Sequence, residues 1–321
     1  MPKGRENPPF KPEARAKSSQ NGQVIFGQLN PMVSRPQVLG LRRVVILAIA
    51  LAGLAAAWHL NLRPHELIPS EGGLTVMRRF FSGAVSPAVS YEAQFVPQGT
   101  QPLLAKAVRA AATTAMFAAA ATSIALVFGL LLGFLGSTAW WADDPSGGYS
   151  RSQRVRRKTL GPAIYLTTRL LLTLSRSIHE LLWAVLFLSA VGLTHLSAVI
   201  AIAIPYAGTF AKVFSEIIDE TPRDAGSALR AAGSSRLQVF LFGLVPRAMP
   251  DLWAYTFYRF ECALRSSAVL GFFGIPTLGY YIHLSFDNTH YREVWTYLYA
   301  LIILVVIVDF WSGALRKRLV V

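Results

Sequence analysis

Long apolar segments separated by short polar stretches run through most of this chain, and their lengths predict membrane-spanning helices. A helix needs about 20 mostly apolar residues to cross a bilayer. Six segments come close to or exceed that length, namely residues 44–60, 110–141, 164–192, 193–211, 253–282 and 294–315. Because these segments are rich in Ala and Leu and are much longer than a membrane-barrel strand, we expect an all-α polytopic membrane protein with about six transmembrane helices.

Two of the predicted spans carry several charges. Residues 164–192 include Arg169, Arg176 and Glu180, and residues 253–282 are charged in their first half. A charge at the centre of a bilayer costs about 2.5 to 3.5 kcal/mol on insertion scales. We therefore expect these side chains to lie at the membrane interface or to line a path enclosed by protein.

Composition supports the membrane class. The chain is 53% hydrophobic and only 15% charged, which is too apolar a balance for a soluble domain of this size. Its single cysteine, Cys262, excludes a disulfide framework or a thiolate metal site within one chain.

The positions of Lys and Arg predict the orientation. They gather in the first 43 residues, in residues 151–158 and in residues 316–318. If these regions face the cytoplasm, both termini are cytoplasmic, and so is the polar loop at 215–250. The net charge of +14 then reflects topology and contact with anionic lipid, and the sequence carries no nucleic-acid-binding motif.

The same pattern divides the chain into three regions. Residues 1–38 are rich in Pro, Gly, Asn, Ser and Lys, which predicts a disordered cytoplasmic tail. Residues 39–103 hold the first transmembrane helix and a periplasmic segment of nearly balanced charge. Residues 104–321 form the remaining membrane core, with the cytoplasmic loop at 215–250.

The polar stretch at 224–246 predicts two short helices. Asp224 is a candidate N-cap and Gly233 a candidate C′ residue for a first helix of about two turns. Small residues such as Ala228 keep this helix thin, so that a partner's groove can approach its backbone. Leu229 then offers an apolar contact and Arg230 an electrostatic one.

The second short helix is predicted to begin with a capping box. Ser235 and Gln238 have the spacing of that motif, and Pro246 is expected to end the helix. Its apolar face is predicted to hold Leu237, Phe240, Leu241 and Leu244. An ordinary amphipathic connector would show the same features.

This stretch resembles the cytoplasmic EAA loop of ABC importer permeases. That pattern is Glu-Ala-Ala, three residues, Gly, nine residues, an apolar residue, one more residue, then Leu-Pro. Gly233 and Pro246 stand at the matching separation. The chain departs from the pattern because Ser227 replaces the Glu, Leu229 the second Ala and Gly243 the apolar residue.

Two further segments narrow the resemblance to the PhnE-like phosphonate permease family. Residues 176–184, Arg-Ser-Ile-His-Glu-Leu-Leu-Trp-Ala, are similar to a family segment that has Pro in place of His179. Residues 261–271, Glu-Cys-Ala-Leu-Arg-Ser-Ser-Ala-Val-Leu-Gly, match the family's Glu, three residues, then Arg-Ser-Ser-x-Val-Leu-Gly. The match fades after Gly274, and the first hundred residues carry little of it.

The resemblance implies a type I ABC importer permease fold and a bacterial inner-membrane location. It also implies the partners of such a permease: a second permease copy, identical or related, ATP-binding subunits and a periplasmic substrate-binding protein. The expected cargo is a small oxyanion, most simply phosphonate or a related phosphorus compound. Another solute stays open.

The sequence lacks the Gly-x-x-x-x-Gly-Lys-Ser/Thr phosphate cradle, so we expect no catalytic residues here and ATP-Mg in a partner subunit. An ion-coupled secondary transporter would need interrupted repeats, and none is visible. An intramembrane enzyme or assembly scaffold is the third class, for which Cys262 and the scattered histidines supply no nucleophile and base at one depth. We expect no metal site and no cofactor in this chain.

The residues expected to matter for transport are the charged and hydroxyl groups at membrane depth. The candidates are Arg176, Glu180, Glu261, Arg265, Ser266 and Ser267. Each Arg stands four residues from one of the Glu residues, so two intrahelical ion pairs are one interpretation. The other is that Arg176 or Arg265, with the serines, donates hydrogen bonds to a passing anion.

Overall fold

The computed structural model describes residues 40–62, 69–141 and 151–319, and it is helical throughout the regular parts of these segments. Contacts divide the chain into two units, residues 1–70 and 71–321. The expected disorder of residues 1–38 falls outside the described residues.

In the described part of the first unit lies the helix α1 (Leu41–His59). Its apolar side chains are exposed on every face, as at Ile46, Leu51 and Leu54. The segment from Arg42 to His59 is apolar and long enough to cross a membrane. An apolar helix that is exposed all round suits a lipid surrounding, as expected for the first span.

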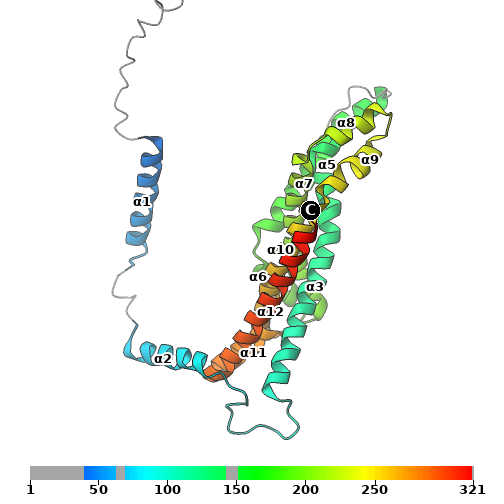
Figure 1. Cartoon of the computed structure of the whole chain (residues 1–321). Coiled ribbons are helices and arrows are strands. Elements are labelled where there is room, and N and C mark those ends of the chain that lie inside the picture. Colours follow the sequence, from blue (N-terminus) through cyan, green and yellow to red (C-terminus); the bar gives the residue numbers. More distant parts are fainter. Residues whose placement is uncertain (1–39, 63–68, 142–150, 320–321) are drawn as a thin grey trace, which may run out of the picture. The chain divides into compact units, whose positions relative to one another are not determined.

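The second unit is a bundle of long helices that run side by side (Figure 1). Three single helices are long and apolar enough to span, and two helix pairs reach that length only together. The elements in order are α2 (Glu71–Val85), α3 (Leu103–Gly136), α4 (Thr138–Trp141), α5 (Arg151–Ser177), α6 (Glu180–Val191), α7 (His195–Glu220), α8 (Asp224–Ala231), α9 (Arg236–Gln238), the π-helix η3 (Val239–Leu244), α10 (Val245–Val269), the 3₁₀ turn η4 (Leu270–Phe273), α11 (Leu278–Asp287) and α12 (Tyr291–Leu319).

Small residues hold α3 and α7 together at the centre of the bundle. Ala121, Ala125, Gly129 and Gly133 follow one another at intervals of four on α3 and are buried. A Cβ on Gly133 would lie only 3.1 Å from Phe214 Cβ. Small residues at this spacing let membrane helices approach closely, which strengthens their van der Waals contact.

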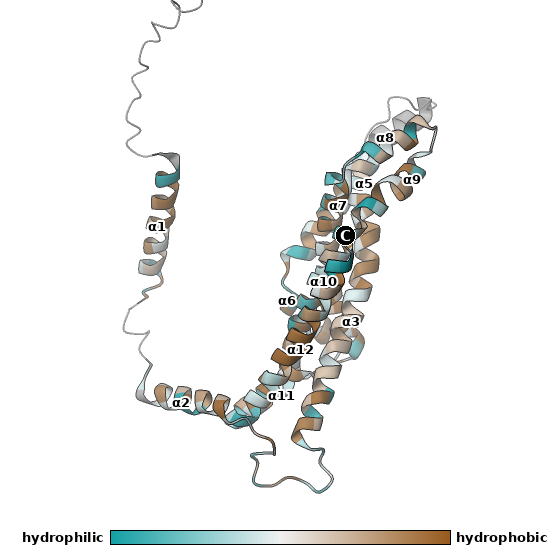
Figure 2. Cartoon of the chain, viewed as in Figure 1, coloured by the Kyte–Doolittle hydropathy of each residue, from teal (hydrophilic) through white to brown (hydrophobic). Residues whose placement is uncertain are grey.

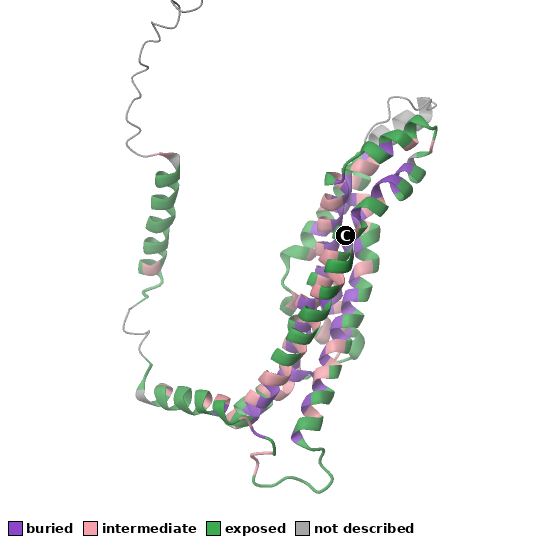
Figure 3. Cartoon of the chain, in the orientation of Figure 1, coloured by how far each residue is buried: buried purple, intermediate pink, exposed green. Residues whose placement is uncertain are grey.

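Exposed positions run along the helices of the bundle, and many of them are hydrophobic (Figures 2 and 3). On α12, Ile303, Val306 and Ile307 are exposed. Exposed apolar side chains of this kind are unfavourable in water but are suited to the hydrocarbon core of a bilayer.

Within the part of the chain that the structure describes, the predicted count of six spans is confirmed when each bent pair counts as one span; otherwise four helices are long and apolar enough to span. The boundaries differ from the prediction. The second span ends at Gly136, where Ser137 adopts an extended conformation, and the short helix α4 follows. The fourth span continues to Glu220 instead of ending at 211.

The helix α2 packs across the start of α12. Trp295 Nε1 donates to the Phe80 carbonyl at 2.6 Å, and Tyr299 Oη donates to the Ala84 carbonyl at 2.8 Å. These bonds attach α2 to the membrane core, while α1 belongs to the other unit.

Candidate functional site

The chain bends sharply between α5 and α6, where the sequence predicted one continuous span. The two helices meet at 89° around Ile178. His179 is the N-cap of α6, and its Nδ1 accepts the Leu181 amide at 3.3 Å. Trp183 Nε1 donates back to the Ser175 carbonyl at 3.4 Å. These bonds satisfy backbone groups that the break leaves without helical partners.

The bend lies against α7 at a point adapted to receive it. Any Cβ on Gly208 would collide with the Ser175 hydroxyl and lie 3.1 Å from Arg176 Cγ. Only glycine therefore permits this approach. Pro205, one turn earlier in α7, lacks an amide hydrogen, and its own carbonyl accepts the Thr209 hydroxyl at 2.8 Å.

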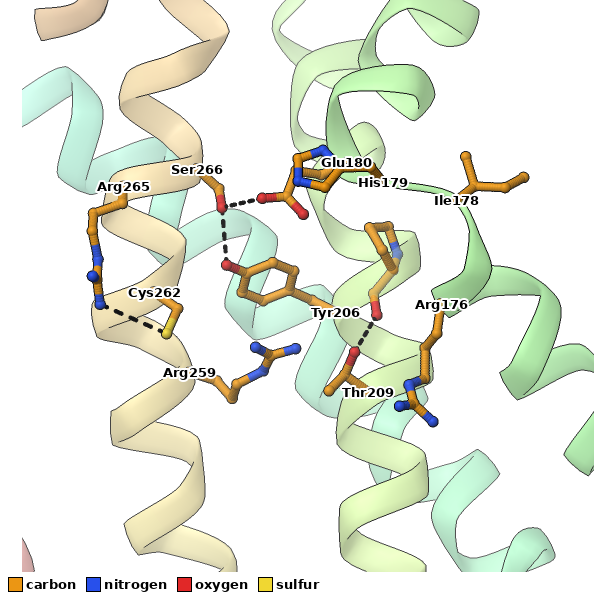
Figure 4. Close-up of a pocket in the computed structure, with 11 residues that line it drawn as sticks. Arg176, Ile178, His179, Glu180, Tyr206, Thr209, Arg259, Cys262, Arg265 and Ser266 are labelled. Carbon is orange, nitrogen blue, oxygen red and sulfur yellow. Dashed lines mark hydrogen bonds between the residues drawn. The ribbon is translucent and has the colours of Figure 1, made fainter. Parts of the chain in front are cut away.

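A cavity of about 300 Å³ opens between the bend, α7 and α10. Figure 4 shows how its walls are arranged, with Arg265, Cys262 and Arg259 on α10, Tyr206 and Thr209 on α7, and Arg176 on α5. The full lining is Arg176, Ile178, His179, Glu180, Pro205, Tyr206, Thr209, Arg259, Cys262, Arg265 and Ser266.

Arg259 is oriented in this lining by aromatic rings. Its guanidinium carbon lies 4.6 Å from the centre of the Tyr206 ring and 5.9 Å from that of Tyr255. The buried Nε has no hydrogen-bond partner. Stacking on aromatic faces orients the guanidinium without neutralising its charge.

A chain of hydrogen bonds links the other polar groups. Ser266 Oγ donates to Glu180 Oε1 at 2.8 Å and lies 3.0 Å from Tyr206 Oη. Because the serine has one hydroxyl hydrogen, already given to Glu180, the tyrosine is the donor to the serine. This chain joins α6, α10 and α7 across the cavity (Figure 4).

The structure brings four of the six predicted pathway residues to this cavity: Arg176, Glu180, Arg265 and Ser266. The other two, Glu261 and Ser267, are not part of its lining. Sequence reasoning missed Arg259, Tyr206, Thr209 and Cys262. Arg259 belongs to the charged half of a predicted span, which was a usable signal, but no spacing pointed to residues on α7.

The two predicted intrahelical ion pairs are wrong. Glu261 pairs with Arg316 on α12, with 3.3 Å between Oε1 and the guanidinium nitrogen, while Arg265 reaches Cys262 Sγ at 3.9 Å. Arg176 and Glu180 lie on opposite sides of the bend, so they do not share a helix. The spacing of four residues implied a regular helix that the chain does not form at 176–180.

Ser267 joins helices of the bundle and does not line the cavity. It is fully buried, and its hydroxyl donates to the Thr114 carbonyl at 2.9 Å. The Thr114 hydroxyl in turn accepts the Leu278 amide at 3.0 Å. These bonds fasten α10 and α11 to α3, on the side of α10 turned away from the cavity residues.

The predicted EAA-like loop is a helical hairpin formed by α8 and η3. Gly233 has a positive φ of 82°, the Ser234 amide bonds to the Leu229 carbonyl at 3.1 Å and the Gly233 amide to the Arg230 carbonyl at 2.9 Å. This pair of bonds is the Schellman motif, so the predicted C′ role of Gly233 is confirmed. The predicted N-cap is wrong: Arg223 holds that position, and Asp224 is the first helical residue.

The second half of the hairpin confirms one prediction and corrects two. Ser235 and Gln238 form the capping box, with bonds of 2.8 and 3.4 Å. The helix does not end at Pro246: a π-helical turn precedes it, and Pro246 lies in the first turn of α10, where its missing amide hydrogen costs little.

The π-helical turn also shifts the buried face of this segment. Phe240 and Leu244 are buried as predicted, but Leu237 and Leu241 are exposed. Five residues instead of four separate bonded groups in a π-helix, so a stripe counted at α-helical spacing loses register across it.

Two glycines set the distance between the halves of the hairpin. A Cβ on Gly243 would lie 3.2 Å from Gly226 Cα and 3.2 Å from Leu229 Cδ1. Leu229 is therefore half-buried inside the hairpin. The remaining candidates on its outer face, which are exposed, are Asp224, Ser227, Ala228, Arg230 and Gly233.

Aromatic packing ties the hairpin to the bundle. The Phe240 ring of η3 lies 4.7 Å from Phe134 at the end of α3 and 5.8 Å from Trp140 on α4. The Asp219 carboxylate near the end of α7 accepts the Ser137 hydroxyl at 2.6 Å and the Ala139 amide at 3.0 Å. These contacts join η3 to the ends of α3 and α7.

Within the described residues, no group of three or more His, Cys, Asp or Glu side chains could hold a metal ion. The arrangement instead offers guanidinium and hydroxyl donors around a small cavity, at the depth of the membrane spans.

Comparison with known proteins places this architecture among transport proteins. A family model described as "binding-protein-dependent transport system inner membrane component" matches residues 148–321. The chain is 31% identical over 199 residues to the phosphite transport system permease protein PtxC of Stutzerimonas stutzeri, covering 62% of this chain and 66% of that protein. It is 25% identical over 236 residues to the phosphate-import permease protein PhnE of Mycolicibacterium smegmatis, covering 74% of this chain and 41% of that protein. In both cases less than two thirds of the relative's length is matched.

Solved structures agree on the fold. An inward-facing structure of the MetNI methionine ABC transporter aligns with a TM-score of 0.54 at 22% identity, covering 68% of this chain and 99% of that chain. An amino acid ABC transporter solved with histidines aligns with a TM-score of 0.53 at 15% identity, covering 67% and 94%. At these identities the likeness concerns the fold alone.

Proposed function

The chain belongs to the family of inner membrane components of binding-protein-dependent transport systems, the membrane-spanning permeases of ABC importers, and we propose that the solute it moves is a small phosphorus oxyanion. Phosphonate, phosphite and phosphate are the members of this class that the names of its relatives suggest. The observation that carries the proposal is the convergence of three arginines on one cavity within the spans.

The charge of the cavity suits an oxyanion. Arg176, Arg259 and Arg265 line the cavity together with a single carboxylate, Glu180, which leaves a formal excess of two positive charges. Guanidinium groups bind tetrahedral oxyanions through several directed hydrogen bonds. A cation would meet net repulsion here, and an apolar solute would leave the arginines without partners.

The strength of the site also suits a permease. A transport path must bind its cargo well enough to admit it and weakly enough to release it. The Glu180 carboxylate and the stacking of Arg259 on Tyr206 moderate the pull of the three guanidinium groups. At about 300 Å³ the cavity is at the lower end of ligand-pocket size, which fits a small anion with some of its water.

Energy is proposed to come from a separate ATP-binding subunit that carries ATP-Mg and docks on the α8–η3 hairpin. The exposed face of α8 is short, thin and mixed in character, which suits a groove on a partner. A second permease copy and a periplasmic binding protein complete the proposed assembly. With the hairpin inside, the C-terminal end of α12 faces the cytoplasm, and the N-terminus does so as well.

Reconstitution tests this proposal. The chain, purified with its ATP-binding subunit, is placed in liposomes, and the binding protein and labelled phosphate, phosphite or methylphosphonate are added outside. We expect ATP-dependent accumulation of at least one phosphorus compound and none of methionine. Accumulation of an amino acid instead, or of no phosphorus compound although ATP hydrolysis responds to the binding protein, contradicts the proposed cargo.

A further inference from the structure

Glu180 supplies the one carboxylate of the cavity lining. Its hydrogen bonds determine which groups of a ligand it can bind. Glu180 Oε1 accepts the Ser266 hydroxyl at 2.8 Å. The hydroxyl bond fixes the carboxylate at the start of α6, and Oε2 is left to accept a further bond from within the cavity (Figure 4). The other charged or titratable groups of the lining are Arg176, His179, Tyr206, Arg259, Cys262 and Arg265.

An ionised carboxylate accepts hydrogen bonds and donates none. Beside an anion it is favourable only if that anion presents a hydrogen to it; otherwise two negative oxygens face each other. Inorganic phosphate keeps at least one P–OH group at neutral pH, because its third ionisation, which would remove the last hydrogen, lies far above neutrality. Sulfate has nearly the same size and tetrahedral shape but carries no such hydrogen.

Resting on the proposed function, we propose that Glu180 is a specificity residue that admits oxyanions carrying a P–OH group and rejects fully ionised ones such as sulfate. The arginines attract any small anion that reaches the cavity. Glu180 adds the discrimination, accepting the P–OH hydrogen at Oε2 while the guanidinium groups donate to the remaining oxygens. Rejection of an analogue that lacks the matching group is the stronger form of selectivity, since the site's own polar group is then left unpaired.

The geometry also explains why the carboxylate is held so firmly. Ser266 donates to Glu180 and accepts from Tyr206, so the serine's hydroxyl hydrogen is committed to the carboxylate. A carboxylate free to rotate could turn toward Arg176 or Arg259 and neutralise it. The Ser266 bond keeps one oxygen occupied and the other available to cargo.

Cys262 supplies a reporter within the same cavity, because it is the single cysteine of the chain and lines the wall. We would measure the rate at which neutral methyl methanethiosulfonate labels Cys262 in the assembled complex in membrane vesicles, with its partner subunits free of reactive cysteine. Phosphate and sulfate would be added separately at one neutral pH and equal ionic strength. The readout is the concentration of each anion that halves the labelling rate.

In the native chain we expect phosphate to protect Cys262 at a concentration about tenfold or more below that of sulfate, because an unpaired polar group carries a penalty of this size. In Glu180→Gln the preference should fall to within about twofold, because the neutral amide neither repels sulfate nor requires a hydrogen from it. Glu180→Asp, which keeps the charge, should retain a preference for phosphate.

Glu216→Gln is the matched control, since Glu216 pairs with Lys212 on α7 outside the cavity, and its ratio should equal that of the native chain. Equal protection by phosphate and sulfate in the native chain overturns the role of Glu180 while leaving the proposed function intact. Protection by neither anion contradicts the cavity as the oxyanion site. The native ratio decides the proposal even if Glu180→Gln fails to assemble.

Discussion

The α8–η3 hairpin and the arginine cavity are the two regions of this permease that we propose to act in transport, and they are built in different ways. The hairpin is local: its bonds join residues within a few positions of one another, as in the Gly233 turn and the Ser235–Gln238 capping box. The cavity is assembled over long distances, since Ser266 and Glu180 are 86 positions apart.

Because they are built differently, the two regions should be sensitive to different kinds of substitution. The hairpin depends on backbone conformation and on glycines that allow close approach, so it should fail when a Cβ or a β-branched residue is added. The cavity depends on charge held at one place by a bend and three helices, so it should fail when charge is changed. The two kinds of failure are separable, because hairpin variants should lose coupling to ATP while cavity variants lose cargo.

The largest expected effect comes from Gly233→Val. Nothing lies within 4 Å of a Cβ at this position, but φ is positive at +82°, so strain in the backbone is the cause. A β-branched residue there costs roughly 1–3 kcal/mol, and we expect the Schellman turn to be lost and ATP-driven uptake to fall to background at normal membrane abundance.

Gly233→Asn is the control for that substitution, because asparagine tolerates a positive φ better than other residues. It should keep most of the uptake. Full transport by Gly233→Val would show that the hairpin is not the coupling element.

The next largest effect is expected from Arg259→Gln. Removing this charge leaves the cavity with two guanidinium groups, and uptake of the phosphorus oxyanion should drop about tenfold or more, since a hydrogen bond to a charged group contributes about 1.5–3 kcal/mol. ATP hydrolysis without cargo should be unchanged because the hairpin is intact. Arg109→Gln, an exposed arginine on α3, should leave uptake as it is; an equal loss there would mean that the effect is not specific to the cavity.

A smaller effect is expected from Gly243→Ala. Its Cβ would lie 3.2 Å from the Gly226 backbone, which cannot move aside as a side chain can. The hairpin should open slightly, and coupled uptake should fall a few-fold. A Cβ on Gly313 would have no other atom within 4 Å, so Gly313→Ala is the control. If coupled uptake by Gly243→Ala equals that of Gly313→Ala, the close contact between Gly243 and Gly226 does not matter for coupling.

The smallest effect on transport is expected at the Glu261–Arg316 pair. Because the pair lies outside the cavity lining, uptake should stay within about twofold, while thermal unfolding of the complex should shift. Glu261→Gln leaves Arg316 with only Asp309, at 3.9 Å, and Arg316→Gln leaves Glu261 without its partner. The double change removes both charges of the pair and should recover most of the stability. Recovery of uptake in Arg265→Leu by Glu261→Gln would instead indicate an ion pair between Glu261 and Arg265, which the structure does not contain.

The sequence predicted the local features because their causes are local. A run of apolar residues defines a span, and Gly233 and the Ser235–Gln238 spacing define a turn and a cap through bonds to neighbouring residues. Those predictions hold, and so does the overall class of the fold.

The bend, the π-helical turn and the cavity could not be predicted in the same way. The break at 177–179 depends on Gly208, 30 positions later, which admits the end of α5 against α7. The π-helical turn before Pro246 shifts the register of the apolar stripe, so α-helical spacing predicted the wrong buried residues for part of it. The partner of Glu261 is Arg316 on another helix. The spacing of four residues favoured Arg265 because a spacing rule identifies only neighbours on the same helix.

If the cavity at Cys262 is a positive site for an anion, the electrostatic potential of the cavity can be measured without knowing the cargo. We would compare the rates at which two thiol reagents of similar size label native Cys262 at low salt, the anionic sulfonatoethyl and the cationic trimethylammonioethyl methanethiosulfonate. We expect the anionic reagent to react about tenfold faster relative to its rate with a free thiol, with the difference shrinking in high salt as charges are screened. A cationic reagent that reacts as fast or faster would contradict the claim.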